Sequence, residues 1–263
     1  MMDLGLAGKT ALVAASSKGL GYGIARALAG EGARVAMCAR NAEEVNAAAA
    51  RLAQETGVST HATACDLTQP DSVVAWVESA AAWGEGIDAL VINAGGPPAL
   101  LLKDATDEQW QAAFNLTVMS AVRLIRAALP YMREGSAILT VTSSSVREPI
   151  PMLGLSTVMR ASVFGMVKVL SEELAPMGIR INNLIPGRIE TDRVLHLDSL
   201  TAQRTGSTPE SVRAGHESRI PLQRLGTTDE FGAAAAFLLS PAAGYITGTA
   251  LRVDGGAMRS VDF

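Results

Sequence analysis

Cysteine is scarce in this chain, which has only Cys38 and Cys65 among its 263 residues. Both stand inside apolar runs, "VAMCA" and "ATACD". Two such residues are expected to be buried free thiols in a reducing cytosol, in preference to a disulfide or a metal site. We therefore expect the site to contain no metal.

Charge of one sign and long apolar runs are also lacking. The formal net charge is −4, and charged residues make up 18% of the chain, which argues against nucleic acid or an anionic membrane as the main partner. No apolar run reaches the roughly 18 residues needed to span a bilayer. The start of the sequence lacks the basic region, apolar stretch and cleavage site of a secretory signal. We expect a soluble, cytoplasmic protein.

The remaining composition is that of a globular protein, with 48% hydrophobic residues and enough length to bury a substantial core. Short apolar runs typical of strands alternate with longer segments of helical spacing. Most of these runs are continuously apolar, as expected of strands covered on both faces, so the alternation predicts an α/β fold with a doubly wound parallel sheet. The strand candidates are residues 10–16, 33–39, 59–66, 88–95, 136–143, 180–186 and 250–256.

We interpret residues 1–263 as a single domain, because we find no repeat, no low-complexity linker and no break in composition. One helix is bounded clearly by Asn41 as its N-cap and Gly57 at its end.

Residues 191–225 depart from the alternating pattern: they are polar and carry two of the three histidines. An insertion of this size is typical of a lid over a site, with surface decoration as the alternative.

A glycine-rich loop follows the first strand candidate, in the run "AASSKGLGYGIA" at residues 14–25. Gly19, Gly21 and Gly23 let the chain turn tightly and bring backbone amides close to a pyrophosphate. The helix that starts there points its positive end at the same phosphates. A glycine cluster alone also has a purely structural interpretation, but its place between a strand and an apolar helix favours a dinucleotide-binding loop.

The charges near this loop indicate which dinucleotide is bound. An acid about 20 residues further on binds the ribose 2′-hydroxyl of NAD, whereas an arginine suits the 2′-phosphate of NADP. The second strand candidate ends in "CARN", with Arg40 and no acid, and Lys18 adds a cation inside the loop. We expect NADP(H) in preference to NAD(H). The alternative is that both side chains are ordinary solvated cations.

At this point the sequence resembles the short-chain dehydrogenase/reductase family over nearly its whole length. "AASSKGLG" stands where the family has Thr-Gly-x-x-x-Gly-x-Gly, "INAG" where it has Asn-Asn-Ala-Gly, and "IPGRIET" where it has Pro-Gly-x-Ile-x-Thr. Asp66 in "CDLT" matches the family's adenine-contacting aspartate. The resemblance implies the following cofactor-binding residues: Ala15, Ser17, Lys18, Gly19, Leu20, Gly21, Arg40, Asp66, Leu67, Asn93, Ala94, Gly95, Arg160, Pro186, Gly187, Ile189 and Thr191.

The resemblance also implies a Rossmann-type sheet of seven parallel strands with helices on both faces, a nicotinamide cofactor and a homo-oligomer, usually a tetramer or else a dimer. It implies reduction of a carbonyl or oxidation of an alcohol, with 3-oxoacyl-(acyl-carrier-protein) reductases as the expected relatives. The expected partner is a small carbonyl or alcohol substrate, and neither nucleic acid nor a membrane.

The family's catalytic frame is present with two of its residues changed. In the family a serine precedes the catalytic tyrosine by 13 residues and a lysine follows it by four, and these positions here hold Ser143, Ser156 and Arg160. Tyrosine has a reference pKa of about 10, whereas the hydroxyl of serine is far less acidic and arginine is not deprotonated in proteins. The chain therefore resembles a divergent branch in which serine and arginine replace the tyrosine–lysine pair.

In our leading hypothesis the chain still reduces a carbonyl, although the phenol of the family's tyrosine is absent. Positions 156 and 160 share a helix face, so Arg160 holds the nicotinamide ribose and supplies a positive field. Ser143 and Ser156 donate hydrogen bonds to the developing oxyanion, and water delivers the proton through Asn115, the helix asparagine of the family.

Other acids in the chain are few. The three tyrosines, Tyr22, Tyr131 and Tyr245, lie outside this frame. His196 and His216 in residues 191–225 are the other candidates, because histidine titrates near neutral pH.

Two functions follow from these observations. The first is an NADP(H)-dependent oxidoreductase that acts on a carbonyl/alcohol pair, such as a 3-oxoacyl thioester, with a serine–arginine site. The second is an NADP(H)-binding sensor or silent subunit with little turnover. This function explains most simply why the family's catalytic tyrosine, the general acid, is missing.

Overall fold

The computed structural model of the chain describes residues 3–261. Its centre is a parallel sheet of seven strands, as expected, and the structure gives their order as β3-β2-β1-β4-β5-β6-β7. The order reverses at β1 and β4, the point where sheets of this kind bind ligands. The strands are β1 (Thr10–Val13), β2 (Arg34–Ala39), β3 (Thr60–Ala64), β4 (Ile87–Ile92), β5 (Met132–Val141), β6 (Arg180–Pro186) and β7 (Ala250–Val253).

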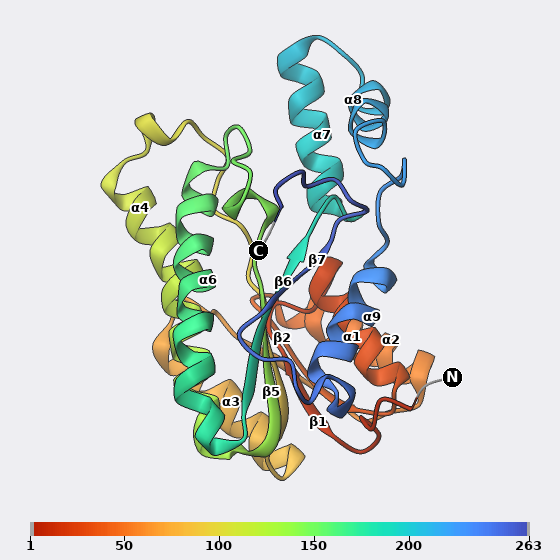
Figure 1. Cartoon of the computed structure of the whole chain (residues 1–263). Coiled ribbons are helices and arrows are strands. Elements are labelled where there is room, and N and C mark those ends of the chain that lie inside the picture. The colour runs from red at the N-terminus through yellow and green to blue at the C-terminus, as the bar shows by residue number, and fades with distance from the viewer. Residues whose placement is uncertain (1–2, 262–263) are drawn as a thin grey trace.

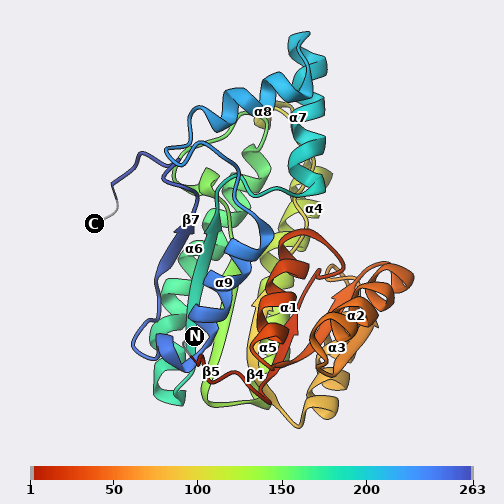
Figure 2. The same ribbon diagram turned by 90° about the vertical axis from the view of Figure 1, so that its right-hand side faces the viewer.

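Helices cover both faces of the sheet (Figures 1 and 2). Successive strand residues point to opposite faces, so Val13 packs into one core layer and Leu12 into the other. The first layer is covered by α1 (Gly19–Gly30), α2 (Ala42–Thr56) and α9 (Thr228–Leu239), and the second by α3 (Pro70–Gly84), α5 (Ser120–Ala128) and α6 (Gly154–Leu174). This double burial explains the continuously apolar strands.

The predicted boundaries of α2 are confirmed. The side chain of Asn41 accepts a hydrogen bond from the N–H of Glu44, and Gly57 ends the helix at a φ of 75°, in the left-handed region that favours glycine. Cys38 and Cys65 are both buried and free, as expected of two thiols in the core layers.

A π-helical turn interrupts the helical stretch Asp107–Tyr131. This turn, η2 (Asn115–Met119), joins α4 (Asp107–Phe114) to α5. In η2 the N–H of Ser120 bonds to the carbonyl of Asn115, five residues earlier. Such turns occur frequently at functional sites, and this one carries the asparagine of the proposed water relay.

The helical stretch Asp107–Tyr131 passes a test for a membrane-crossing helix by length and composition, although it contains no continuous run of 18 apolar residues. The stretch is 25 residues long, and an 18-residue window within it has a mean hydropathy of 1.3. One such helix is weak evidence, because buried helices pass too. Ala121, Leu124 and Ala128 of α5 are buried in the second core layer, and this packing accounts for the apolar face.

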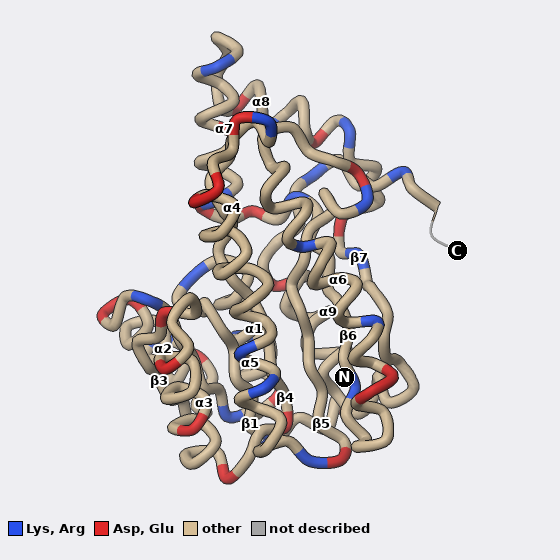
Figure 3. The backbone as a smooth tube through the Cα atoms, turned by 90° about the vertical axis from the view of Figure 1, so that its left-hand side faces the viewer, with Lys and Arg blue, Asp and Glu red and all other residues tan. Residues whose placement is uncertain are grey.

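Residues 191–225 form two helices, α7 (Asp192–Thr205) and α8 (Pro209–Glu217). They stand beyond the carboxyl ends of the strands (Figures 1 and 2). Over the molecule as a whole, charged residues of both signs are interspersed (Figure 3). The role of this segment as a lid stays a prediction. The short elements are η1 (Leu102–Asp104), η3 (Leu129–Tyr131), η4 (Ser144–Val146), η5 (Ala175–Met177) and η6 (Pro241–Ala243).

Candidate functional site

The glycine loop between β1 and α1 is built to bring backbone close to a ligand. Gly19 has a φ of 60°, and a Cβ on Gly21 would lie 2.3 Å from the carbonyl oxygen of Ala15, so no other residue fits at position 21. Lys18, the N-cap of α1, makes no side-chain capping bond. The first N–H groups of α1 therefore keep their capacity to bind phosphate.

Ala15 occupies the place of the first glycine in the family's motif. Its φ of 49° lies in the left-handed region, which costs a residue with a Cβ roughly 1–2 kcal/mol. The neighbouring strand supports this conformation, since Nδ2 of Asn93 donates to the carbonyls of Ala14 and Ala15 at 3.3 and 3.1 Å. Asn93 thus joins the loop after β4 to the loop after β1.

The predicted adenosine end of the site contains the two predicted cations and two carboxylates, those of Glu44 and Asp66. Arg40 is exposed at the end of β2. Nζ of Lys18 lies 3.7 Å from Oε2 of Glu44, and Ser17 donates to the same oxygen at 3.4 Å. Oδ1 of Asp66 accepts from the N–H and hydroxyl of a nearby threonine, which fixes the carboxylate at the end of β3. Buried Leu67 follows it.

The turn after β6 lies against the chain after β7 and against the glycine loop after β1. A Cβ on Gly187, which follows Pro186, would lie 2.5 Å from Cα of Asp254, so the turn packs directly on the chain after β7. Ile189 is buried. Thr191, the N-cap of α7, has its Cγ2 3.7 Å from the Cβ position of Gly19. The predicted cofactor-binding segments therefore converge at the carboxyl end of the sheet.

Arg193, which the sequence did not single out, reaches across this end of the sheet. Its Nη2 lies 3.7 Å from the Cβ position of Gly96, in the loop that follows β4 and Gly95. The contact joins the start of α7 to that loop.

Ser143 and Ser156 are placed by the ends of β5 and the start of α6. Oγ of Ser143 accepts the N–H of Ser145 at 3.1 Å and lies 3.0 Å from the Ser145 hydroxyl. Ser156 is buried in the first turn of α6. Its Oγ accepts a hydrogen bond from Nε of Arg160 at 3.3 Å, so the predicted pair on one helix face is in contact.

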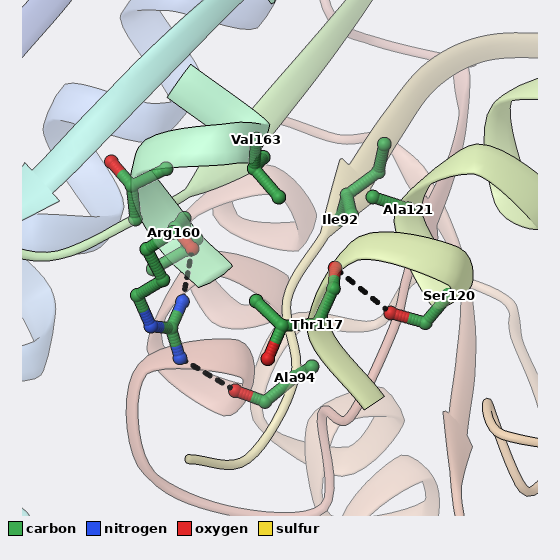
Figure 4. Close-up of a pocket in the computed structure, with 9 residues that line it drawn as sticks. Ile92, Ala94, Thr117, Ser120, Ala121, Arg160 and Val163 are labelled. Atoms are coloured by element: carbon green, nitrogen blue, oxygen red, sulfur yellow. Dashed lines mark hydrogen bonds between the residues drawn. The ribbon is translucent and has the colours of Figure 1, made fainter. Parts of the chain in front are cut away.

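Arg160 extends from α6 to the carboxyl ends of two strands. Nη1 donates to the carbonyl of Val141 at 2.7 Å and Nη2 to that of Ala94 at 3.3 Å (Figure 4). Burial lowers the pKa of this guanidinium to about 10, which leaves it a cation at neutral pH. No carboxylate within residues 3–261 forms a salt bridge with it, so its charge stands unneutralised at the predicted catalytic position.

Two buried hydroxyls beside Arg160 were missed from the sequence. Thr117 lies in η2 two residues after Asn115, and Thr142 directly precedes Ser143. Both line a small cavity against Arg160. In the sequence, only their closeness to Asn115 and Ser143 could have indicated a place in the site. The directions of their side chains depend on the π-turn and on the end of β5, which the sequence pattern does not show.

The two candidate histidines lie in α7 and α8. Nε2 of His216 is 3.9 Å from Oδ1 of the buried Asp198, which is also ion-paired with Arg188 of the turn after β6. Burial, followed by the charge of Arg188, lowers the pKa of His216. His216 therefore packs within the α7–α8 segment, and His196 is exposed on α7.

Comparison with known proteins identifies relatives over nearly the whole chain. The family model described as "Enoyl-(Acyl carrier protein) reductase" matches residues 14–258. The chain is 36% identical over 256 residues to "Dehydrogenase/reductase SDR family member 4" of Sus scrofa, covering 95% of this chain and 88% of that protein.

Two solved structures are similar in fold and sequence. L-sorbose reductase from Gluconobacter frateurii, complexed with NADPH and L-sorbose, superposes with a TM-score of 0.94 at 33% identity, covering 99% of this chain and 100% of that one. The NADPH-bound short-chain oxidoreductase of Pseudomonas aeruginosa PAO1, described as containing an atypical catalytic center, has a TM-score of 0.86 at 32% identity and covers 96% and 98%.

Proposed function

This chain belongs to the short-chain dehydrogenase/reductase family of NAD(P)-dependent oxidoreductases, which act on carbonyl and alcohol substrates, and we propose that it reduces a carbonyl with NADPH through Ser143, Ser156 and Arg160. The observation that carries the proposal is the placement of Arg160. Its guanidinium touches Ser156 and the ends of β4 and β5, so a fixed positive charge stands where the family's lysine would.

The residues around the glycine loop fit a dinucleotide. The uncapped start of α1 and the glycine at position 21, where no Cβ fits, suit a pyrophosphate. NADPH, when bound, supplies the hydride that a carbonyl carbon receives. The relatives from Gluconobacter frateurii and Pseudomonas aeruginosa bind NADPH, which supports the same cofactor here.

Ser143 and Ser156 donate hydrogen bonds to the substrate oxygen, and Arg160 supplies positive charge, in place of the family's tyrosine. Because Oγ of Ser156 accepts the Nε–H of Arg160, its own hydrogen is available to the carbonyl oxygen of the substrate. Ser143, held by Ser145, donates a second hydrogen bond. The charge of Arg160 stabilises the negative charge that develops on that oxygen, and water provides the proton because neither hydroxyl is acidic enough.

This arrangement is expected to be slower than a tyrosine site on equal substrates. A positioned general acid contributes roughly 10²–10⁴-fold, or about 3–5 kcal/mol of barrier. Positioning of the cofactor and electrostatic stabilisation remain. We therefore propose slow but measurable turnover on a small ketone or a 3-oxoacyl thioester.

The test is NADPH oxidation, followed by absorbance, across a panel of ketones and 3-oxoacyl thioesters. Saturable turnover with at least one substrate is the expected result. Tight NADPH binding without turnover across the panel would overturn the proposal in favour of a sensor or silent subunit. Binding of neither dinucleotide would exclude both functions.

The choice of NADP(H) over NAD(H) is tested by Arg40→Asp. We expect NADPH affinity to fall by about 100-fold, since a charge-assisted bond to a phosphate is lost and a repulsion gained, while NADH affinity stays within about threefold. Titration calorimetry measures both. The control Lys103→Ala removes a solvated cation paired with Asp104 and leaves both affinities unchanged; equal losses for the two dinucleotides in Arg40→Asp would refute the assignment.

We also propose a homo-oligomer built on α4 and α6, which lie side by side (Figure 1). Val169 of α6 is 59% exposed, Val158 is exposed about three turns earlier on the same helix, and Phe114 is exposed at the end of α4. Sedimentation of the wild type should give a dimer or tetramer, and Val169→Glu should give a smaller species, because a charge in an apolar interface is costly. Val74→Glu, at an exposed position of α3, is the control. A monomeric wild type would contradict the proposal.

A further inference from the structure

A small cavity lies beside Arg160, between η2 and the ends of β4 and β5 (Figure 4). Most of its lining is apolar, from residues such as Ile92 and Val163. Its polar lining comes from Arg160, Thr117, Thr142 and Ser120. The cavity therefore adjoins the side of the guanidinium that faces the protein interior.

Two hydroxyls in this lining have no partner. Thr117 and Thr142 are 5% and 2% exposed, and neither Oγ1 has a hydrogen-bond partner. Ser120 differs, because its hydroxyl donates to the carbonyl of Leu116. Buried polar groups are nearly always hydrogen-bonded, directly or through ordered water, so the two threonines call for a partner inside the cavity.

Arg160 has donors left for the same partner. A guanidinium carries five N–H groups, and three of them bond to Ser156, Val141 and Ala94. Two N–H groups remain, and the guanidinium lines the cavity. The cavity thus combines two hydroxyls, each able to donate and accept, with a donor-rich cation.

The space fits one water molecule. About 10 Å³ is available to the centre of a water-sized sphere, close to the roughly 10–15 Å³ that one buried water needs, and a water of this kind requires two to four polar partners. We propose that one buried water bridges Oγ1 of Thr117, Oγ1 of Thr142 and the guanidinium of Arg160, and that the two threonines are positioning residues for Arg160.

This assignment differs from a water held by the backbone of Asn115. The carbonyl of Asn115 accepts the N–H of Ser120 within the π-turn, whereas the unpartnered groups are the hydroxyls of Thr117 and Thr142. In this proposal the π-turn contacts the water beside Arg160 through the side chain of Thr117, two residues after Asn115. The effect on catalysis rests on the proposed function, while the water itself does not.

The experiment joins a structure with kinetics. A high-resolution crystal structure of the full chain is expected to show water density within hydrogen-bond distance of both threonine hydroxyls and Arg160. Thr117→Val/Thr142→Val keeps the side-chain shape, removes both hydroxyls and should leave the cavity dry. We expect kcat to fall about tenfold, since small misplacements at a site cost up to 10²-fold, and the matching pair of serine variants to restore it to within about twofold.

The outcomes separate the two proposals. Ordered water in a protein without turnover would overturn the proposed function and support the inference. A dry cavity in an active wild-type enzyme, or serine variants that behave like the valine variants, would overturn the inference alone. Thr10→Val is the control, because it removes a buried hydroxyl bonded to Gly84 at the opposite end of β1; it should lower the melting temperature and leave kcat unchanged.

Discussion

Arg160→Met is expected to lower kcat/KM for NADPH-dependent carbonyl reduction by about 10²–10³-fold, the usual cost of one preorganised donor at a developing oxyanion. Methionine reproduces the unbranched stem of arginine as far as Nε and so keeps its packing against α6, but it carries no charge. It also leaves Ser156 and the carbonyls of Val141 and Ala94 without their donor. Initial rates over a range of NADPH and ketone concentrations give the change.

Arg180→Met is the matched control for this variant. Arg180, the first residue of β6, is half-buried like Arg160, and burial lowers its pKa as well. Its guanidinium donates to the carbonyls of Leu238 and Ser240 at the end of α9. We expect this control to lower the melting temperature and to keep kcat/KM. An Arg160→Met protein that folds and retains its rate would show that the guanidinium takes no part in the reaction.

Ser156→Tyr combined with Arg160→Lys is expected to raise kcat/KM on simple ketones by about 10²–10⁴-fold, the contribution of a positioned general acid. The lysine cation lowers the pKa of the phenol from about 10, and a phenol near neutrality protonates the alkoxide directly. Both positions lie on one face of α6 and are already in contact. Steady-state rates on the same ketone panel measure the gain.

The control for this pair is Ser156→Phe with Arg160→Lys, which adds the ring without the hydroxyl and should bring no gain. The pH profile gives a second signature. Reduction needs the protonated phenol, so the rate of the tyrosine–lysine variant should fall as pH rises through the phenol's pKa, whereas the wild type should lack that limb. No gain from the tyrosine–lysine pair would mean that the scaffold does not bring a ketone to position 156.

The strands, and the places of the loops that follow them, were predictable because their signals are local or ordered along the chain. Continuous apolar runs marked buried strands, and a capping Asn41 with a terminal Gly57 marked α2. Gly21 indicated a tight turn, and the structure shows the backbone of Ala15 too close to position 21 for a Cβ. Each of these depends on a few neighbouring residues.

Other features depend on contacts between distant segments and were not predictable. The π-turn at Asn115 gives no local signal, because its helical sequence reads as one continuous helix. Thr117 and Thr142 meet only because η2 packs beside β5 at Arg160. The ion pair between Arg188 and the buried Asp198 likewise joins the turn after β6 to α7.

Transfer of deuterium from NADPH labelled at C4 tests most directly whether Ser143, Ser156 and Arg160 support reduction without a phenol. With the wild-type enzyme and a ketone that is turned over, we predict deuterium on the carbinol carbon of the product, and a yield reduced at least 100-fold by Arg160→Met. Firm NADPH binding with unlabelled, unreacted ketone in the wild type would contradict this account and leave a cofactor-binding protein without catalysis.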